Sequence, residues 1–154
     1  MDLGDIKTYF PTIDPSFKIT SPITQDYNCI AWAAGQDEAW WWPDPSNFWP
    51  CSNIGPPTVE RFKEAFAILG YRPSASSQLV PGMEKVAIYA DAAELVTHMA
   101  RQIANGRWTS KLGASWDIEH LRPECLNSDC YGTFLICLAR PVPAVAGLAD
   151  EVEP

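Results

Sequence analysis

One cysteine and one histidine in this chain stand where they could act together in covalent catalysis. Cys29 follows Asn28, a favourable N-cap residue, and opens an apolar, alanine-rich run that ends at Gly35. Unpaired N–H groups at the start of a helix stabilise a thiolate and lower the pKa of the thiol. Cys29 is therefore a candidate nucleophile. His98 lies on a candidate strand and is the candidate general base, because histidine titrates near neutral pH.

A third group normally orients the histidine of such a pair. We expect Asp117 in this role, because a carboxylate accepts a hydrogen bond from the imidazole N–H and stabilises the imidazolium. Ser110, after a one-residue bulge, and a backbone carbonyl are the alternatives. The second of the two histidines, His120, falls in a less regular stretch and is expected to be a surface or capping residue.

An oxyanion hole is expected around the nucleophile, because a tetrahedral intermediate needs hydrogen-bond donors aimed at its oxygen. The backbone N–H of Cys29 is the first candidate donor. The candidates for the second donor come from the residues just before it and are Asn28, Tyr27 and Gln25.

A hairpin places a lysine near the candidate base. Asn105-Gly106 is typical of a two-residue hairpin turn. With such a loop, Thr109 and Lys111 share the face of His98, and Ser110 points to the other face. We then expect Lys111 to support the thiolate electrostatically or to hold a substrate carboxylate.

The elements that must position these residues follow an α+β order. Thr58 and Gly70 are the start and stop signals of the clearest helix. Residues 22–140 are expected to form a single domain, with 1–21 as an extended arm and 141–154 as a frayed acidic tail. Hydrophobic periodicity predicts helices at 28–34 and 58–69, followed by antiparallel strands at 85–90, 95–104, 107–112 and 131–139.

Residues 40–50 contain four of the chain's seven tryptophans, and prolines there exclude a regular helix or a central strand. We expect an irregular segment whose indoles pack over the edge of the core. Aromatic side chains beside a nucleophile could also line a substrate groove, and the candidates are Trp41 and Trp42.

Composition bounds the partners of the protein. A formal net charge of −8 opposes binding to nucleic acid or to an anionic membrane surface, both of which attract basic residues. No stretch approaches the roughly 20 apolar residues of a membrane span, and the N-terminus lacks the pattern of a secretory signal. We therefore expect a cytoplasmic protein, with specialised export left open.

The five cysteines do not suggest a disulfide framework or a metal site. Their odd number, without a secretory signal, favours reduced thiols. Cys125, Cys130 and Cys137 follow His120, but their intervals do not match a structural zinc site. Cys137 lies in an apolar run and is expected to pack as a small hydrophobe. We expect no metal and no cofactor.

Five motifs resemble a small bacterial domain family of unknown function, over roughly residues 22–140. They are YNCIAWA at 27–33, WWWP at 40–43, THMARQ at 97–102, WTSKLG at 108–113 and DIEH at 117–120. More distantly, the order of helix-start cysteine and hairpin-strand histidine resembles the papain-like superfamily, especially the NlpC/P60 and CHAP amidases and endopeptidases. This resemblance implies a papain-like α+β fold and a thiol hydrolase with Cys29 as nucleophile and His98 as base. Its substrate would be a peptide, isopeptide or related amide, cleaved through an acyl-thioester.

Two positions depart from the papain-like pattern. Lys111 stands where the polar orienting residue is expected, and Ile30 replaces the usual small residue after the cysteine. A non-catalytic member is therefore the alternative. Such a protein would hold a peptide or a partner protein in an aromatic groove, or act as an adaptor or immunity-type protein whose acidic surface neutralises a basic partner.

Overall fold

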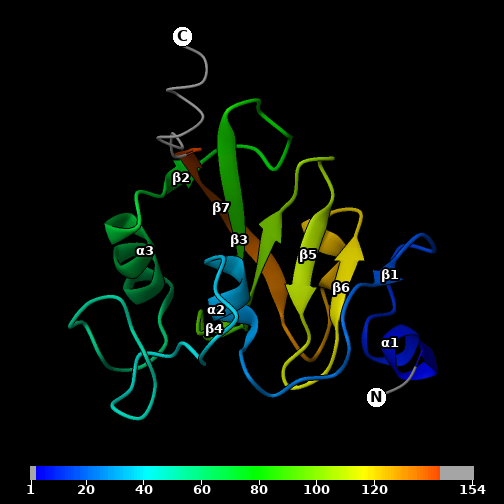
Figure 1. Cartoon of the computed structure of the whole chain (residues 1–154), viewed down its shortest axis with the longest axis horizontal. Coiled ribbons are helices and arrows are strands. Elements are labelled where there is room, and N and C mark those ends of the chain that lie inside the picture. The colour runs from blue at the N-terminus through cyan, green and yellow to red at the C-terminus, as the bar shows by residue number, and fades with distance from the viewer. Residues whose placement is uncertain (1–2, 143–154) are drawn as a thin grey trace, which may run out of the picture.

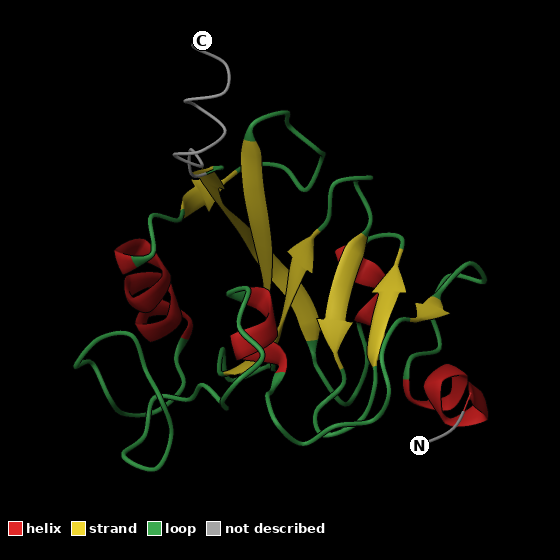
Figure 2. Ribbon diagram, viewed as in Figure 1, coloured by secondary structure: helices red, strands yellow, loops and turns green. Residues whose placement is uncertain are grey.

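A seven-stranded antiparallel sheet organises residues 3–142, the part of the chain that the computed structural model describes. The strand order is β1-β6-β5-β4-β3-β7-β2, and a short helix, α2, packs against the sheet (Figures 1 and 2). The α+β class predicted from the sequence is confirmed. The elements are α1 (Leu3–Tyr9), β1 (Lys18–Ile19), α2 (Cys29–Ala33), α3 (Val59–Ile68), β2 (Arg72–Ser74), β3 (Met83–Ala90), β4 (Val96–Gln102), β5 (Trp108–Lys111), β6 (Asp117–His120), the 3-10 helix η1 (Pro123–Leu126) and β7 (Thr133–Pro141).

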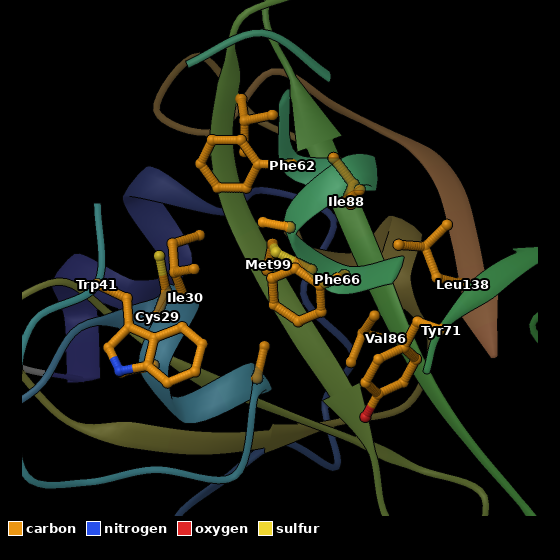
Figure 3. Packing of buried hydrophobic residues seen from close by; sticks show 14 of the residues in the cluster. Cys29, Ile30, Trp41, Phe62, Phe66, Tyr71, Val86, Ile88, Met99 and Leu138 are labelled. Carbon is orange, nitrogen blue, oxygen red and sulfur yellow. The ribbon is translucent and has the colours of Figure 1, made fainter. Parts of the chain in front are cut away.

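The sheet has a hydrophobic cluster on each face. Along β3, Val86 and Ile88 join one cluster, and Ala87 and Tyr89 join the other, as the alternation of a strand requires. The first cluster packs under α2 and α3, and Figure 3 shows part of it. The second packs under α1 and η1. We call these two surfaces of the sheet the α2 face and the α1 face.

Local sequence signals set the two predicted helices. The Thr58 side chain accepts a hydrogen bond from the Arg61 N–H, which caps α3, and Gly70 follows its end with φ 98°. Asn28 caps α2, and Gly35 follows it with φ 84°. Residues 40–50 form no helix or extended strand, as predicted, and only a bridge between Trp41 and Phe48 joins their ends.

The predicted register of the β4–β5 hairpin is wrong by one residue. The Ile103 N–H donates to the Arg107 carbonyl, so the loop has three residues, and Gly106 closes it with φ 88°. Arg101 pairs with Thr109, and both side chains lie on the α2 face. A shift of one residue turns every side chain to the opposite face of the sheet. Thr109 and Lys111 therefore do not share the face of His98, whereas Ser110 does.

The N-terminal arm is more regular than predicted. Residues 3–9 form α1, and Ile6 and Phe10, spaced four residues apart, bury their side chains on the α1 face. Residues 18–19 form β1, which pairs with β6 at one edge of the sheet. Strand β6 itself lies in the stretch expected to be irregular, because its pairing with β5 is not a local property.

Two expectations concern the ends of the chain and the membrane. Of the tail predicted at 141–154, the structure describes only Pro141, the last residue of β7, and Val142. The remainder lies outside the described residues. Within residues 3–142, no helix has the length and apolar character needed to cross a bilayer.

Candidate functional site

Asn28 fixes the start of α2 and joins it to residues 40–50, the tryptophan-rich segment. Its Oδ1 accepts from the N–H of Ala31 at 3.1 Å and from the N–H of Trp41 at 3.0 Å. Its Nδ2 donates to the Trp41 carbonyl at 2.8 Å. The side chain is 4% exposed. Asn28 therefore acts as a helix cap and a structural bridge.

The Cys29 thiol lies at the first position of α2, on the α2 face of the sheet, close to Ile30 and Trp41 (Figure 3). Burial raises its pKa to about 11, although backbone groups of Met99 and Ile30 and the charge of Lys111 act in the opposite direction. The lowered pKa expected at a helix start is therefore not found. The helix has only five residues, and its N-terminal field is too weak to offset the desolvation of the thiolate.

His98 is fully buried on the α1 face of the sheet. Its ring stacks on Tyr131, with centroids 4.1 Å apart and 6° between the planes, and meets the edge of Tyr89 at 5.0 Å. Neither ring nitrogen has a hydrogen-bond partner. Burial, and to a smaller extent the charge of His120, holds the pKa of His98 well below its usual value. The structure therefore does not join His98 to Cys29 by a hydrogen bond.

Asp117 lies on the α2 face, where it accepts a hydrogen bond from the Tyr27 hydroxyl at 2.6 Å. Burial raises the pKa of this carboxyl group, although the bond from Tyr27 lowers it. Its pairing with Lys111 across β5 and β6 sets its side chain on the face opposite His98. Asp117 thus meets Tyr27 and not the imidazole that it was expected to orient.

Lys111 is fully buried beside Tyr27. Its Nζ donates to the carbonyls of Thr24, at 2.7 Å, and of Ser115, and lies 5.2 Å from the centre of the Tyr27 ring. Burial lowers the pKa of this ammonium group, and the charges of Asp117 and Cys29 oppose the shift. Lys111 therefore ties two loops to the end of β5.

Ser110 and His120 form a separate pair on the α1 face. The distance from Ser110 Oγ to His120 Nε2 is 2.8 Å, and His120 Nδ1 lies 3.0 Å from the Arg122 carbonyl. Because a carbonyl only accepts, Nδ1 carries the proton and Nε2 accepts from the hydroxyl. His120 is fully buried, and burial lowers its pKa to about 4. The prediction of a surface or capping histidine is therefore wrong, since β6 carries this side chain into the second cluster.

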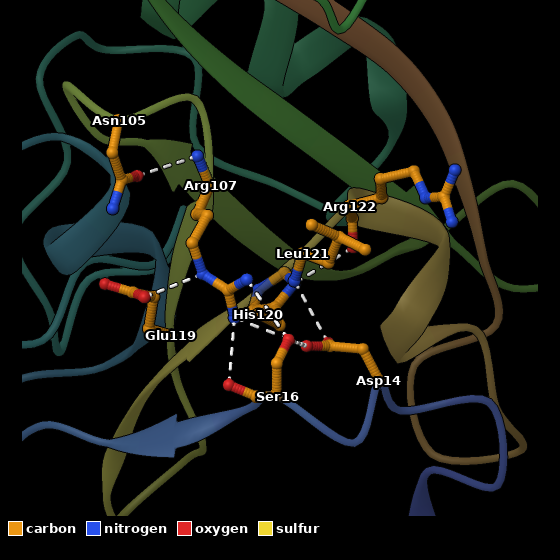
Figure 4. Close-up of polar contacts among 8 residues, drawn as sticks. All are labelled: Asp14, Ser16, Asn105, Arg107, Glu119, His120, Leu121 and Arg122. Carbon is orange, nitrogen blue, oxygen red and sulfur yellow. Dashed lines mark hydrogen bonds and ion pairs between the residues drawn. The ribbon is translucent and has the colours of Figure 1, made fainter.

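Arg107 binds the N-terminal arm near His120, through Asp14 and Ser16 (Figure 4). Its Nε donates to Glu119 at 2.7 Å, and its Nη2 lies 3.3 Å from Asp14. The other Asp14 oxygen accepts from the Leu121 N–H at 3.0 Å. Sequence reasoning missed this cluster, because Asp14 and Arg107 are far apart in the chain and follow no motif.

A cavity of about 370 Å³ opens beside the start of α2. Trp40, Trp42 and Tyr131 give it aromatic walls, and Cys29 reaches it. Its remaining lining residues are Asn28, Asn47, Thr97 and Gly113.

Only some of the residues predicted for the site line this cavity. Cys29, Asn28 and Trp42 do so. Gln25 adjoins it through its carbonyl, which accepts from the indole of Trp40 at 2.6 Å. The others are elsewhere: His98, Asp117, Tyr27, Lys111, Ser110 and Trp41 do not line it.

Tyr131 and Trp40 are the walls that sequence reasoning missed. Tyr131 reaches the cavity from the loop before β7, about 100 residues beyond Cys29 in the chain. The only sequence signal for Trp40 was its place in the tryptophan-rich segment. Within the described part of the chain, no group of three or more His, Cys, Asp or Glu side chains could hold a metal ion.

Comparison with known proteins shows a family and no characterised relative. No curated protein and no solved structure matches the chain. Residues 18–139 match the model of a domain of unknown function, DUF7689, which spans all the strands except the last two residues of β7. Because this match covers most of the sequence, the chain belongs to the DUF7689 family.

Proposed function

We propose that this protein is a binding module, in which the aromatic cavity beside α2 takes an apolar side chain of a peptide or partner protein. The observation that carries the proposal is the cavity itself, about 370 Å³ with three aromatic walls. Binding sites for small groups are typically concave and apolar, with a few polar groups at fixed places. Trp40, 38% exposed, also leaves part of an indole open to a ligand at the rim.

The polar side chains of the cavity favour an apolar occupant, because they already have partners inside the protein. Asn28 bonds to Trp41, and the Thr97 hydroxyl donates to the Tyr131 carbonyl. The Asn47 amide donates to Asp44 at 3.0 Å. A ligand group that needed new hydrogen bonds would lose its hydration without compensation, whereas an apolar group would gain by leaving water.

This proposal can be tested with N-acetyl-L-leucinamide, which presents one apolar side chain between two peptide groups. We expect the indole N–H signals of Trp40 and Trp42 to shift during a titration, with a Kd of about 1–10 mM for this single side chain. N-acetylglycinamide, which lacks the side chain, is the control ligand. Nuclear magnetic resonance of the ¹⁵N-labelled protein gives the measurement.

Two variants sharpen this test. Trp40→Ala removes one wall and should weaken binding at least about fivefold. Phe48→Ala removes an exposed aromatic ring of the same segment that does not line the cavity, and should leave the affinity unchanged. Equal affinity in Trp40→Ala and the unmodified protein, or no response to the leucine derivative, would contradict the proposal.

A papain-like thiol hydrolase is the second candidate, and one observation favours it: Cys29 reaches the cavity where a substrate would lie. Its nucleophile would be Cys29, and the amide bond of a peptide its target. Two observations weigh against it. The thiol has a raised pKa, and His98 offers no hydrogen bond to it.

Alkylation by iodoacetamide separates the two candidates through its pH dependence. Only the thiolate reacts, and with a pKa of about 11 roughly one Cys29 in 10,000 is ionised at pH 7. The ionised fraction rises with pH below the pKa, so the rate at Cys29 should increase about tenfold per pH unit from pH 7 to 10. Peptide mass spectrometry locates the modified thiols, and the exposed Cys130 serves as the internal reference. Faster labelling of Cys29 than of Cys130 at pH 6, lost on denaturation, would favour the hydrolase.

A further inference from the structure

A second cavity, of about 400 Å³, lies on the α2 face beside Trp32 of α2. It shares no lining residue with the aromatic cavity. Its walls include Trp32 from α2 and Tyr27 from the preceding loop, whose ring centroids are 5.3 Å apart. Its floor is polar, which sets it apart from the first cavity.

Three neighbouring strands build this polar floor. Arg101 on β4 pairs with Thr109 on β5, which pairs with Glu119 on β6, so the three side chains form one row across the sheet. Asp117 stands two residues before Glu119 and therefore on the same face. Sheet pairing thus holds a guanidinium group and two carboxyl groups in fixed relative positions.

Most polar groups of this floor have partners within the protein. The Trp32 indole donates to Thr109 Oγ1 at 2.9 Å, and Glu119 accepts from Arg107 at 2.7 Å. Asp117 Oδ2 accepts from Tyr27. These contacts link the lining residues to one another and to Arg107.

Two atoms of the floor lack partners. Asp117 is 2% exposed, and its Oδ1 has no hydrogen bond. The Nε–H of Arg101 is also buried without an acceptor, while the guanidinium group lies 5.0 Å from the centre of the Trp32 ring. Buried polar groups in proteins are rarely left unpaired, so both atoms call for a partner of opposite kind. Asp117 Oδ1 requires a hydrogen-bond donor, and the Arg101 Nε–H requires an acceptor.

We propose that this cavity binds an α-ammonium group and the carbonyl or carboxylate oxygen next to it, as found in a free amino acid or at the N-terminus of a peptide. The ammonium group donates to Asp117 Oδ1, and the oxygen accepts from Arg101 Nε. A simple cation would leave the arginine unpaired, and a simple anion would leave the aspartate unpaired. Asp37, exposed at the rim, adds negative charge for the ammonium group.

The test uses three alanine derivatives and the indole N–H of Trp32, whose signal is identified by its loss in Trp32→Phe. L-Alanine and L-alaninamide carry the ammonium group, and N-acetyl-L-alanine does not. We expect the Trp32 signal to shift with at least one of the first two, titrated to about 10 mM, and to stay in place with the third. Preference for L-alanine identifies a free amino acid as the ligand, whereas equal affinities identify a peptide N-terminus.

Variants tie the response to the proposed contacts. Asp117→Asn keeps the size of the side chain and should weaken binding at least about tenfold. Because this residue is buried, Asp37→Asn at the rim provides a second variant, expected to weaken binding about threefold at low salt. Glu38→Gln removes an exposed charge that does not line the cavity and is the matched control.

Three results would overturn this proposal: no shift of Trp32 with any derivative, equal binding of N-acetyl-L-alanine, or unchanged affinity in both aspartate variants. The signals of Trp40 and Trp42 report separately on the aromatic cavity. The outcome for the polar cavity is therefore independent of the proposed binding of apolar side chains.

Discussion

Replacement of Gly132 by alanine is expected to destabilise the protein by about 3 kcal/mol or more. Gly132 has φ 67°, and a Cβ added there would lie 2.0 Å from the Ala90 carbonyl oxygen and 2.7 Å from its carbon. Both atoms belong to the backbone of β3, beside the pair of Ala90 with Thr133, so no side-chain rotation can relieve the clash. Urea unfolding at neutral pH measures the loss as a lower midpoint.

Gly35→Ala is the matched control for this prediction. Gly35 also has a positive φ, 84°, but a Cβ there would meet nothing within 4 Å. Only backbone strain should therefore appear, at about 1 kcal/mol. If the two substitutions have equal effects on the free energy of unfolding, steric exclusion by β3 is not the cause at Gly132.

Asn28→Ala is expected to lower the free energy of unfolding by about 3 kcal/mol. The substitution removes the cap of α2 and all three hydrogen bonds of the side chain to Ala31 and Trp41. It also leaves the buried N–H and carbonyl of Trp41 without these partners, which adds a desolvation penalty. Urea unfolding checks the value, and the Trp40 and Trp42 indole signals report any opening of the aromatic cavity.

Thr58→Ala gives the comparison for Asn28. Thr58 is the N-cap of α3, and its side chain accepts from the Arg61 N–H at 3.2 Å. Loss of an ordinary cap costs about 1 kcal/mol. The additional loss of unfolding free energy in Asn28→Ala, relative to Thr58→Ala, therefore measures how much the link between α2 and the tryptophan-rich segment stabilises the protein. A cost no greater than that of Thr58→Ala would show that this link adds no stability.

Local features of the fold could be predicted from the sequence, and features that depend on pairing could not. Thr58 and Asn28 cap their helices because a side chain reaches an N–H only a few residues away. Asn105-Gly106 marked the hairpin correctly but fits loops of two and of three residues. Strands β1 and β6 carry no strong pattern of their own and become strands through their neighbours.

The candidate site shows the same limit more sharply. Cys29 and Asn28 were placed at a helix start from local sequence, and both line the cavity. The partner expected for the thiol, His98, lies on the other face of the sheet, and a one-residue error in hairpin register assigned it Thr109 and Lys111 as neighbours. The raised pKa of Cys29 also depends on burial by distant segments, which outweighs the effect of its place on the helix.

The two outermost strands of the sheet determine how it meets other polypeptides. β1 has two residues and an exposed Lys18, and β2 has three residues and contains Pro73, which has no N–H to donate. Long, flat, unprotected outer strands act as templates for intermolecular pairing and fibril growth. Here the strand at each edge of the sheet is short, and it carries an exposed lysine or a proline, both of which oppose pairing with another chain. β3, one of the two longest strands, is paired on both sides by β4 and β7, and β2 covers residues 137–139 of β7.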